Sequence, residues 1–124
     1  MTELPSALAV IDGTLSQLTR NGVRSRHHVP LATAVVEFRQ GPLCVYVREH
    51  PYGLLPGIAN VYCLDADLRL QWLAEWPDSV GPCTQILEVT AEKFVAASAN
   101  GSVVTLDAHT GRLHRVDQSL AAAG

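Results

Sequence analysis

The chain has 124 residues, with nine Lys and Arg against twelve Asp and Glu, and a formal net charge of −3 at pH 7. Hydrophobic residues make up 48% and charged residues 17%, a composition that excludes a disordered charged tail and fits one globular domain. The sequence shows neither the roughly 20 apolar residues of a membrane helix nor a secretion signal at residues 1–5, so we expect a soluble, cytoplasmic protein with neither membrane nor nucleic acid as its partner.

Short apolar runs dominate the chain, separated by Gly or Pro about every ten residues, which is typical of many short strands. They predict an all-β, antiparallel fold with strands near residues 7–12, 15–20, 23–28, 33–39, 43–49, 59–65, 69–75, 84–89, 94–99, 102–107 and 112–116. Good helix formers at 70–76 and 91–99 leave a helix open as the alternative for those two segments.

Three turns are specified by their residue types. Asn21-Gly22 and Asn100-Gly101 lie between predicted strands, where a two-residue hairpin requires positive φ at both positions. At the third turn, Asp107 can accept the backbone N–H groups of the residues that follow it. Gly111 can supply a left-handed residue there at low cost.

The three cysteines are Cys44, Cys63 and Cys83, an odd number without a CxxC pair. Each lies among apolar residues or Pro, which is typical of a small buried side chain. A small secreted scaffold would usually carry an even set of cysteines. We therefore predict no disulfide, and burial of at least two of the three.

Several predicted strands are apolar on both faces. Residues 94–97 and 103–106 do not alternate between apolar and polar side chains. A strand that is apolar on both sides is buried on both sides. These strands therefore predict sheets that pack against two neighbours.

An internal repeat ends in aspartate. Residues 8–12, 61–65 and 103–107 are each an apolar strand followed by Asp12, Asp65 or Asp107, and these aspartates are 53 and 42 residues apart. A spacing of about 40–50 residues matches one four-stranded propeller blade. The spacing predicts one β domain with a half blade at 7–20, blades at 29–76 and 84–117, and a tail at 118–124.

Residues 100–113 resemble the blade repeat of quinoprotein-type β-propellers, which are related to WD-like propellers. The match falls on Gly101, Val103, Leu106-Asp107-Ala108 and Thr110-Gly111. In that family a tryptophan docks one blade on the next. Here the first and last copies of the repeat have Arg20 and Arg115 at that position, and in the middle copy Trp72 lies one residue before it. The resemblance implies a partial propeller of two to two and a half blades, without a cofactor and with no functional residue carried over. A β-sandwich or barrel, and then an α+β fold, remain the alternatives.

Two and a half blades cannot close a ring, since propellers have four to eight. An open array exposes apolar sheet at its ends, and a monomer rarely leaves such a patch uncovered. We therefore expect a homo-oligomer, with a dimer as the commonest closed arrangement. Leu54, Trp72 and Trp76 are the residues we expect at or near the subunit interface.

Motifs for catalysis and metal binding are missing from the sequence. We therefore expect a non-catalytic, propeller-like scaffold that self-associates and displays loops to a protein partner. One alternative is an enzyme or small-molecule-binding module at the 48–57 loop, because binding residues concentrate on such loops; its residues would be Arg48, Glu49, His50 and Tyr52. Another is an anion-binding hairpin at 20–28, where strand alternation would place Arg24, Arg26 and His28 on one face.

Overall fold

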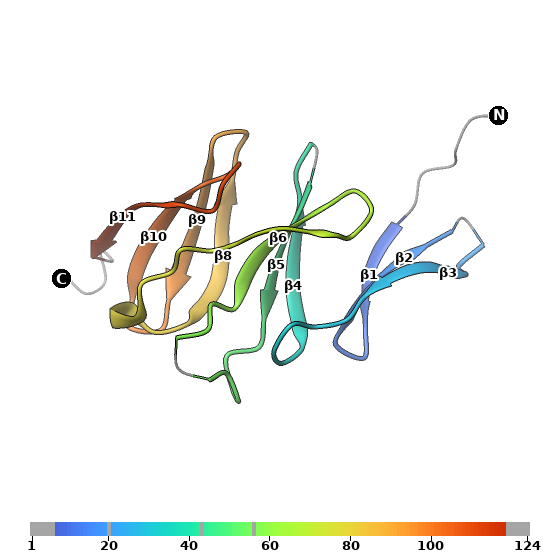
Figure 1. Cartoon of the computed structure of the whole chain (residues 1–124), viewed down its shortest axis with the longest axis horizontal. Helices are drawn as coiled ribbons and strands as arrows, with labels where there is room; N and C mark the ends of the chain where they lie inside the picture. Colours follow the sequence, from blue (N-terminus) through green and yellow to red (C-terminus); the bar gives the residue numbers. More distant parts are fainter. Residues whose placement is uncertain (1–6, 20, 43, 56, 119–124) are drawn as a thin grey trace.

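A computed structural model describes residues 7–19, 21–42, 44–55 and 57–118. These residues form eleven strands in three antiparallel sheets, which lie in a row along the longest axis of the molecule (Figure 1). The all-β prediction is confirmed, and each of the eleven expected strands is present. Segments 70–76 and 91–99 contain strands, so the helical alternative is wrong there. Of the expected tail at 118–124, Gln118 belongs to the last strand, and residues 119–124 lie outside the described residues.

The first sheet has the order β1-β2-β3, with β1 (Ala7–Ile11), β2 (Thr14–Leu18) and β3 (Arg24–His28). The second sheet has the order β4-β5-β6-β7, with β4 (Val35–Gln40), β5 (Cys44–Glu49), β6 (Val61–Asp65) and β7 (Leu70–Leu73). The third sheet has the order β8-β9-β10-β11, with β8 (Cys83–Val89), β9 (Lys93–Ser98), β10 (Ser102–Asp107) and β11 (Leu113–Gln118). A short 3-10 turn, η1 (Asp78–Val80), precedes β8.

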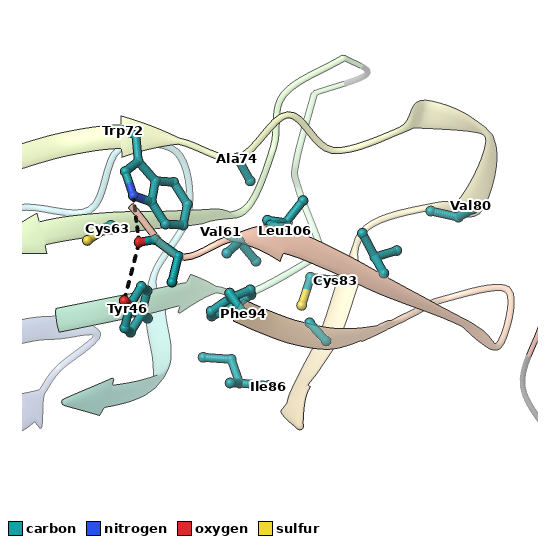
Figure 2. Close-up of a cluster of buried hydrophobic side chains, with 13 residues drawn as sticks. Tyr46, Val61, Cys63, Trp72, Ala74, Val80, Cys83, Ile86, Phe94 and Leu106 are labelled. Carbon is teal, nitrogen blue, oxygen red and sulfur yellow. Dashed lines mark hydrogen bonds between the residues drawn. The ribbon is translucent and has the colours of Figure 1, made fainter. Parts of the chain in front are cut away.

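Neighbouring sheets pack face to face. One buried cluster fills the space between the first and second sheets, and it includes Leu15, Val47, Tyr62 and Leu64. A larger cluster lies between the second and third sheets and is drawn in Figure 2; it includes Tyr46, Cys63, Trp72, Phe94 and Leu106. The second sheet is thus buried on both faces.

The third sheet is covered on one face only. Phe94 and Val104 face the second sheet and are fully buried. Val95 and Val103 alternate with them along β9 and β10, and they stay partly exposed. Burial on both faces, which the apolar runs predict, therefore holds for the middle sheet but not for β9 and β10 within one chain.

The hairpins differ from the sequence prediction in one respect. In the Asn100-Gly101 turn, Gly101 has a φ of 90° and donates its N–H to the Ser98 carbonyl at 3.0 Å, but Asn100 does not have a positive φ. This is a three-residue connection with a left-handed glycine at its end. The two-residue turn with positive φ at both positions is instead Asp12-Gly13, with φ values of 52° and 76°.

The repeat is real in the structure, but its first copy lies on β2 rather than β1. In each sheet the strand before the last carries a leucine at its last or last but one position, at Leu18, Leu64 and Leu106. The next residue is Thr19, Asp65 or Asp107, and its N–H donates across the turn to a carbonyl 2.8 Å away. A register shift against the last strand occurs just before the leucine in all three sheets. The expected equivalence of Asp12 is therefore wrong, because Asp12 belongs to the β1–β2 hairpin.

Candidate docking site between the repeated sheets

The four residues expected to bind a ligand do not converge. The Arg48 side chain is paired with Glu37 inside the protein, with Nε 2.7 Å from Oε1. Glu49 is 1% exposed. His50 accepts the Tyr52 N–H through Nδ1 at 3.1 Å, and their rings lie 5.4 Å apart at the surface. Arg48 and Glu49 are thus engaged in internal contacts, which leaves only His50 and Tyr52 together.

The Glu49 carboxylate anchors the connection between β3 and β4. It accepts the backbone N–H groups of Leu31, Ala32 and Thr33 at 2.6–2.9 Å, and also the Tyr62 hydroxyl. Burial favours the neutral acid, but these hydrogen bonds outweigh burial and hold the pKa of Glu49 below its ordinary value. Glu49 is therefore a structural anion.

His28 extends this buried network. Its Nε2 lies 2.6 Å from the Tyr62 hydroxyl, and the ring is only 8% exposed. Burial lowers the pKa of His28, although the charge of Glu49 opposes that shift. The network joins His28, expected in an anion site, with Glu49, expected in a ligand site. Neither faces solvent.

The basic hairpin does not present one cationic face. Arg26 pairs with Gln17 and Arg24 with Leu18, so Ser25 is an extra residue in β3. This bulge breaks the alternation and places Arg24 on the opposite face from Arg26. The expectation that Arg24, Arg26 and His28 share a face is therefore wrong; Arg20 lies outside the described residues.

A cavity of about 360 Å³ does lie beside the predicted loop. Leu54 and Trp76, both expected near an interface, line it together with Leu55, which is 71% exposed, and Ile58. The Trp76 indole N–H donates to the Gly81 carbonyl at 2.7 Å, which fixes the ring at the cavity wall. The sequence analysis pointed to this loop, but the lining is mostly apolar, with Asp78 as its charged residue, and it contains none of the four expected ligand residues.

The tightest contact between sheets is made by Trp72 on β7. The ring covers Gly111 so closely that a Cβ there would lie 2.6 Å from Trp72 Cδ2. Its indole N–H donates to the Ala108 carbonyl at 3.3 Å, and the Tyr46 hydroxyl donates to the same oxygen (Figure 2). Trp72 is 8% exposed. It therefore belongs to an interface within the chain, rather than to the expected interface between chains.

In the first sheet, Arg26 occupies the position that Trp72 occupies in the second sheet. Arg26 is paired with Gln17, and Trp72 with Cys63, each just before the register shift. Where Trp72 reaches the turn that follows β10, Arg26 reaches the turn that follows β6. There its Nη1 lies 2.9 Å from the Asp67 carboxylate, and both side chains are about half exposed. The last strand of the first sheet and that of the second sheet thus each dock on a turn of the sheet that follows.

Arg115 takes this position in the third sheet, where it is paired with Thr105. Its side chain is 71% exposed and forms an ion pair with Asp117 of its own strand, with Nε 2.8 Å from Oδ2. At the other end of the row, a Cβ on Gly22 would meet no atom within 4 Å, although Gly22 has a φ of 79°, close to the 75° of Gly111. Among the described residues, neither Arg115 nor Gly22 thus takes part in a contact between sheets like that of Trp72 and Gly111.

Sequence reasoning missed this set because it aligned the first repeat on Asp12. A usable signal was present, since Leu18-Thr19 before Asn21-Gly22 matches Leu106-Asp107 before Gly111. A threonine hydroxyl replaces the capping carboxylate: Thr19 Oγ1 accepts the Val23 N–H at 3.2 Å, as Asp65 Oδ1 accepts the Arg69 N–H at 3.0 Å. Aligning Thr19 with Asp65 gives repeat spacings of 46 and 42 residues.

Comparisons with known proteins bear on the fold alone. No family model matches the chain. No curated protein matches it significantly in sequence. Among solved structures, it is similar to the computationally designed Ika4 protein, with a TM-score of 0.69 and 18% identity over 94% of this chain and 68% of that one. Within the residues that the structure describes, no helix is long and apolar enough to cross a membrane.

Proposed function

We propose that this protein is a non-catalytic β-propeller-like scaffold that self-associates through its two end sheets. One observation carries the proposal: the docking position is occupied at both internal sheet contacts, by Arg26 and Trp72, and unused at Arg115. The three sheets correspond to three propeller-like units, of which the first has three strands.

The end faces are apolar enough to support association. Leu18 on the outer face of the first sheet is partly exposed, whereas its equivalents Leu64 and Leu106 are fully buried between sheets. On the outer face of the third sheet, Val95 and Val103 form the apolar part of a hollow of about 280 Å³, whose other lining residues are polar or charged and include Lys93 and Asp117. Apolar burial contributes about 25 cal/mol per Å², so covering both faces is favourable.

The test is the mass of the protein in solution. We expect light scattering at micromolar concentration to give a multiple of the 13.3 kDa chain mass. Val103→Glu, on the outer face of the third sheet, should return it to a monomer. Thr84→Glu, at an exposed position on β8, is the matched control and should leave the mass unchanged. A wild-type monomer at all accessible concentrations would refute the proposal.

A second candidate is an apolar-ligand module, supported by the cavity lined by Leu54, Leu55 and Trp76. Its test is titration with the apolar dye anilinonaphthalene sulfonate while Trp76 fluorescence is followed. Saturable quenching that Leu54→Asp abolishes, and that Leu70→Asp at an exposed position on β7 leaves unchanged, supports this candidate. Dye binding without that selectivity counts against it.

A further inference from the structure

Among the described residues, the first sheet lacks a strand that the other two sheets have. The second and third sheets begin with β4 and β8, each at one edge of its sheet, whereas the first sheet begins with β1 (Figure 1). In the repeat, β1 is equivalent to β5 and β9, because each directly precedes and pairs with the strand that carries the repeated leucine. The missing strand therefore belongs beside β1, at the place that β4 takes beside β5.

The backbone of β1 has hydrogen-bonding groups that face this edge. Because β1 and β2 are joined by the two-residue turn Asp12-Gly13, Ile11 and Ala9 bond to β2 through their backbone groups. Leu8 and Val10 alternate with them and therefore direct their N–H and C=O groups away from β2. Within the described part of the chain, these groups have no backbone partner on that side.

The equivalent residues of the second sheet hold a strand. Leu8 and Tyr46 are equivalent, because each is paired with the residue just before the repeated leucine. Val10 is then equivalent to Arg48. Tyr46 and Arg48 are both paired with residues of β4. A strand beside β1 would therefore give the first sheet the pattern of the other two.

One side chain of β4 remains partly exposed next to this edge. Phe38 of β4 and Ile86 of β8 have the same register position in their sheets. Ile86 is fully buried, and its N–H donates to Glu37 Oε1 at 3.1 Å. Its carbonyl accepts from Arg39 Nη2 at 2.9 Å. Phe38 is only partly buried. A strand beside β1 would cover Phe38 as β4 covers Ile86.

Beyond self-association, we propose that the edge of β1 binds an extended segment of another protein as a fourth, antiparallel strand. Leu8 and Val10 exchange backbone hydrogen bonds with this segment. Such bonds provide affinity in strand addition, and the side chains that alternate along the added strand provide specificity. The bound segment also removes the open edge that β1 otherwise presents to solvent.

The contact between β4 and β8 indicates which side chains suit the bound segment. Glu37 and Arg39 project from β4 and bind the backbone of Ile86 through the polar ends of long side chains. A segment beside β1 projects its side chains in the same way toward Phe38. It therefore needs long side chains with polar ends on that face, and the sequence of β4 itself meets this requirement.

A synthetic peptide of residues 33–41, which contains β4, is the probe. It should bind the full chain and slow the hydrogen exchange of the Leu8 and Val10 amides, followed by NMR. The Ala9 and Ile11 amides bond to β2 and should exchange slowly without the peptide. Slow exchange of Leu8 and Val10 in the free protein would show that the edge is already covered. Slowing that follows protein concentration alone would assign the edge to a second copy. Either result would overturn the inference.

A proline variant tests the backbone contact. Val10→Pro removes the N–H that faces the edge and keeps the bonds to β2, since proline is tolerated on an edge strand where its N–H would face solvent. Val10→Ala is the matched control, because it shortens the same side chain but keeps the N–H. The dissociation constant of the labelled peptide, measured by fluorescence anisotropy, should rise about tenfold or more for Val10→Pro and less than about twofold for Val10→Ala. Equal weakening by both variants would contradict the proposed pairing.

Methylated peptides repeat the test without changing the protein. In β4 the Gly41 N–H donates to the Cys44 carbonyl at 2.8 Å, so the Arg39 N–H also faces β5 and the Phe38 N–H faces away. N-methylation at Arg39 of the peptide should abolish binding, and N-methylation at Phe38 should leave it unchanged. A peptide that does not bind, or that loses binding equally with either methyl group, would overturn the inference. Neither result bears on self-association, which the solution mass tests.

Discussion

Replacing Gly111 by alanine tests the contact that holds the second and third sheets together. Gly111 has a φ of 75°, and a left-handed alanine costs about 1 kcal/mol. The new Cβ would also lie 2.6 Å from Trp72 Cδ2, so the indole must move. Overpacking of this kind costs about 2 kcal/mol. Gly111→Ala should therefore lower the free energy of unfolding by about 3 kcal/mol.

Gly101→Ala is the matched control, because Gly101 has a φ of 90° but no atom within 4 Å of the added Cβ. Gly101→Ala should lower the free energy of unfolding only by the cost of a left-handed alanine, about 1 kcal/mol. Urea denaturation of both variants gives the difference, and fluorescence in a Trp76→Phe background reports whether Trp72 has moved. If the two variants lose the same free energy within about 0.5 kcal/mol, the docking contact does not constrain the sheets as argued.

Three further predictions concern the buried polar and thiol groups. Tyr62→Phe should lower the free energy of unfolding, measured by urea denaturation, by about 2 kcal/mol, because it removes a hydrogen-bond donor from the buried Glu49 carboxylate. An unchanged free energy would mean that the carboxylate does not need the tyrosine hydroxyl. The contribution of His28 to stability should be constant above its ordinary pKa of 6.5 and should be lost below it, because the folded pKa is lowered and the unfolded chain takes up the proton first. The contribution of Glu49 should be lost in the same way below 4.5. Urea midpoints that rise on acidification from pH 7 to 5 would contradict this sign. A thiol reagent should modify at most one cysteine in the native protein and three in the unfolded chain. Burial protects Cys63 and Cys83, and it raises the pKa of the Cys83 thiol to about 12. Rapid labelling of all three cysteines in the native protein would contradict their burial.

The cysteine and turn predictions depended on short stretches of sequence. All three cysteines are free, and two are buried, as their apolar neighbours indicated. Asp107 accepts the N–H groups of His109 and Thr110 at 2.8 and 3.0 Å, as the residue types of that turn predicted. Such features are determined locally, because a cap or a left-handed residue is decided within about five residues.

Sheet membership and the partners of ionic side chains could not be predicted in this way. The strand at Arg24–His28 and its hairpin with the strand before it were expected, but the Ser25 bulge that turns Arg24 away leaves no mark in the alternation of side chains. Glu49 was singled out as a ligand residue because it is a carboxylate on a loop edge, yet three backbone N–H groups from residues 31–33 surround it.

The sequence by itself therefore determined the number of strands, their approximate bounds and the capped turn at Asp107. Tertiary structure decided that Trp72 covers Gly111, that Arg26 forms an ion pair with Asp67, and that Arg115 pairs with Asp117 of its own strand instead. The physical reason is sequence separation. Strand and turn preferences act between residues that are close in sequence. The contacts between sheets join residues some 40 positions apart, and whether these meet depends on how the sheets stack.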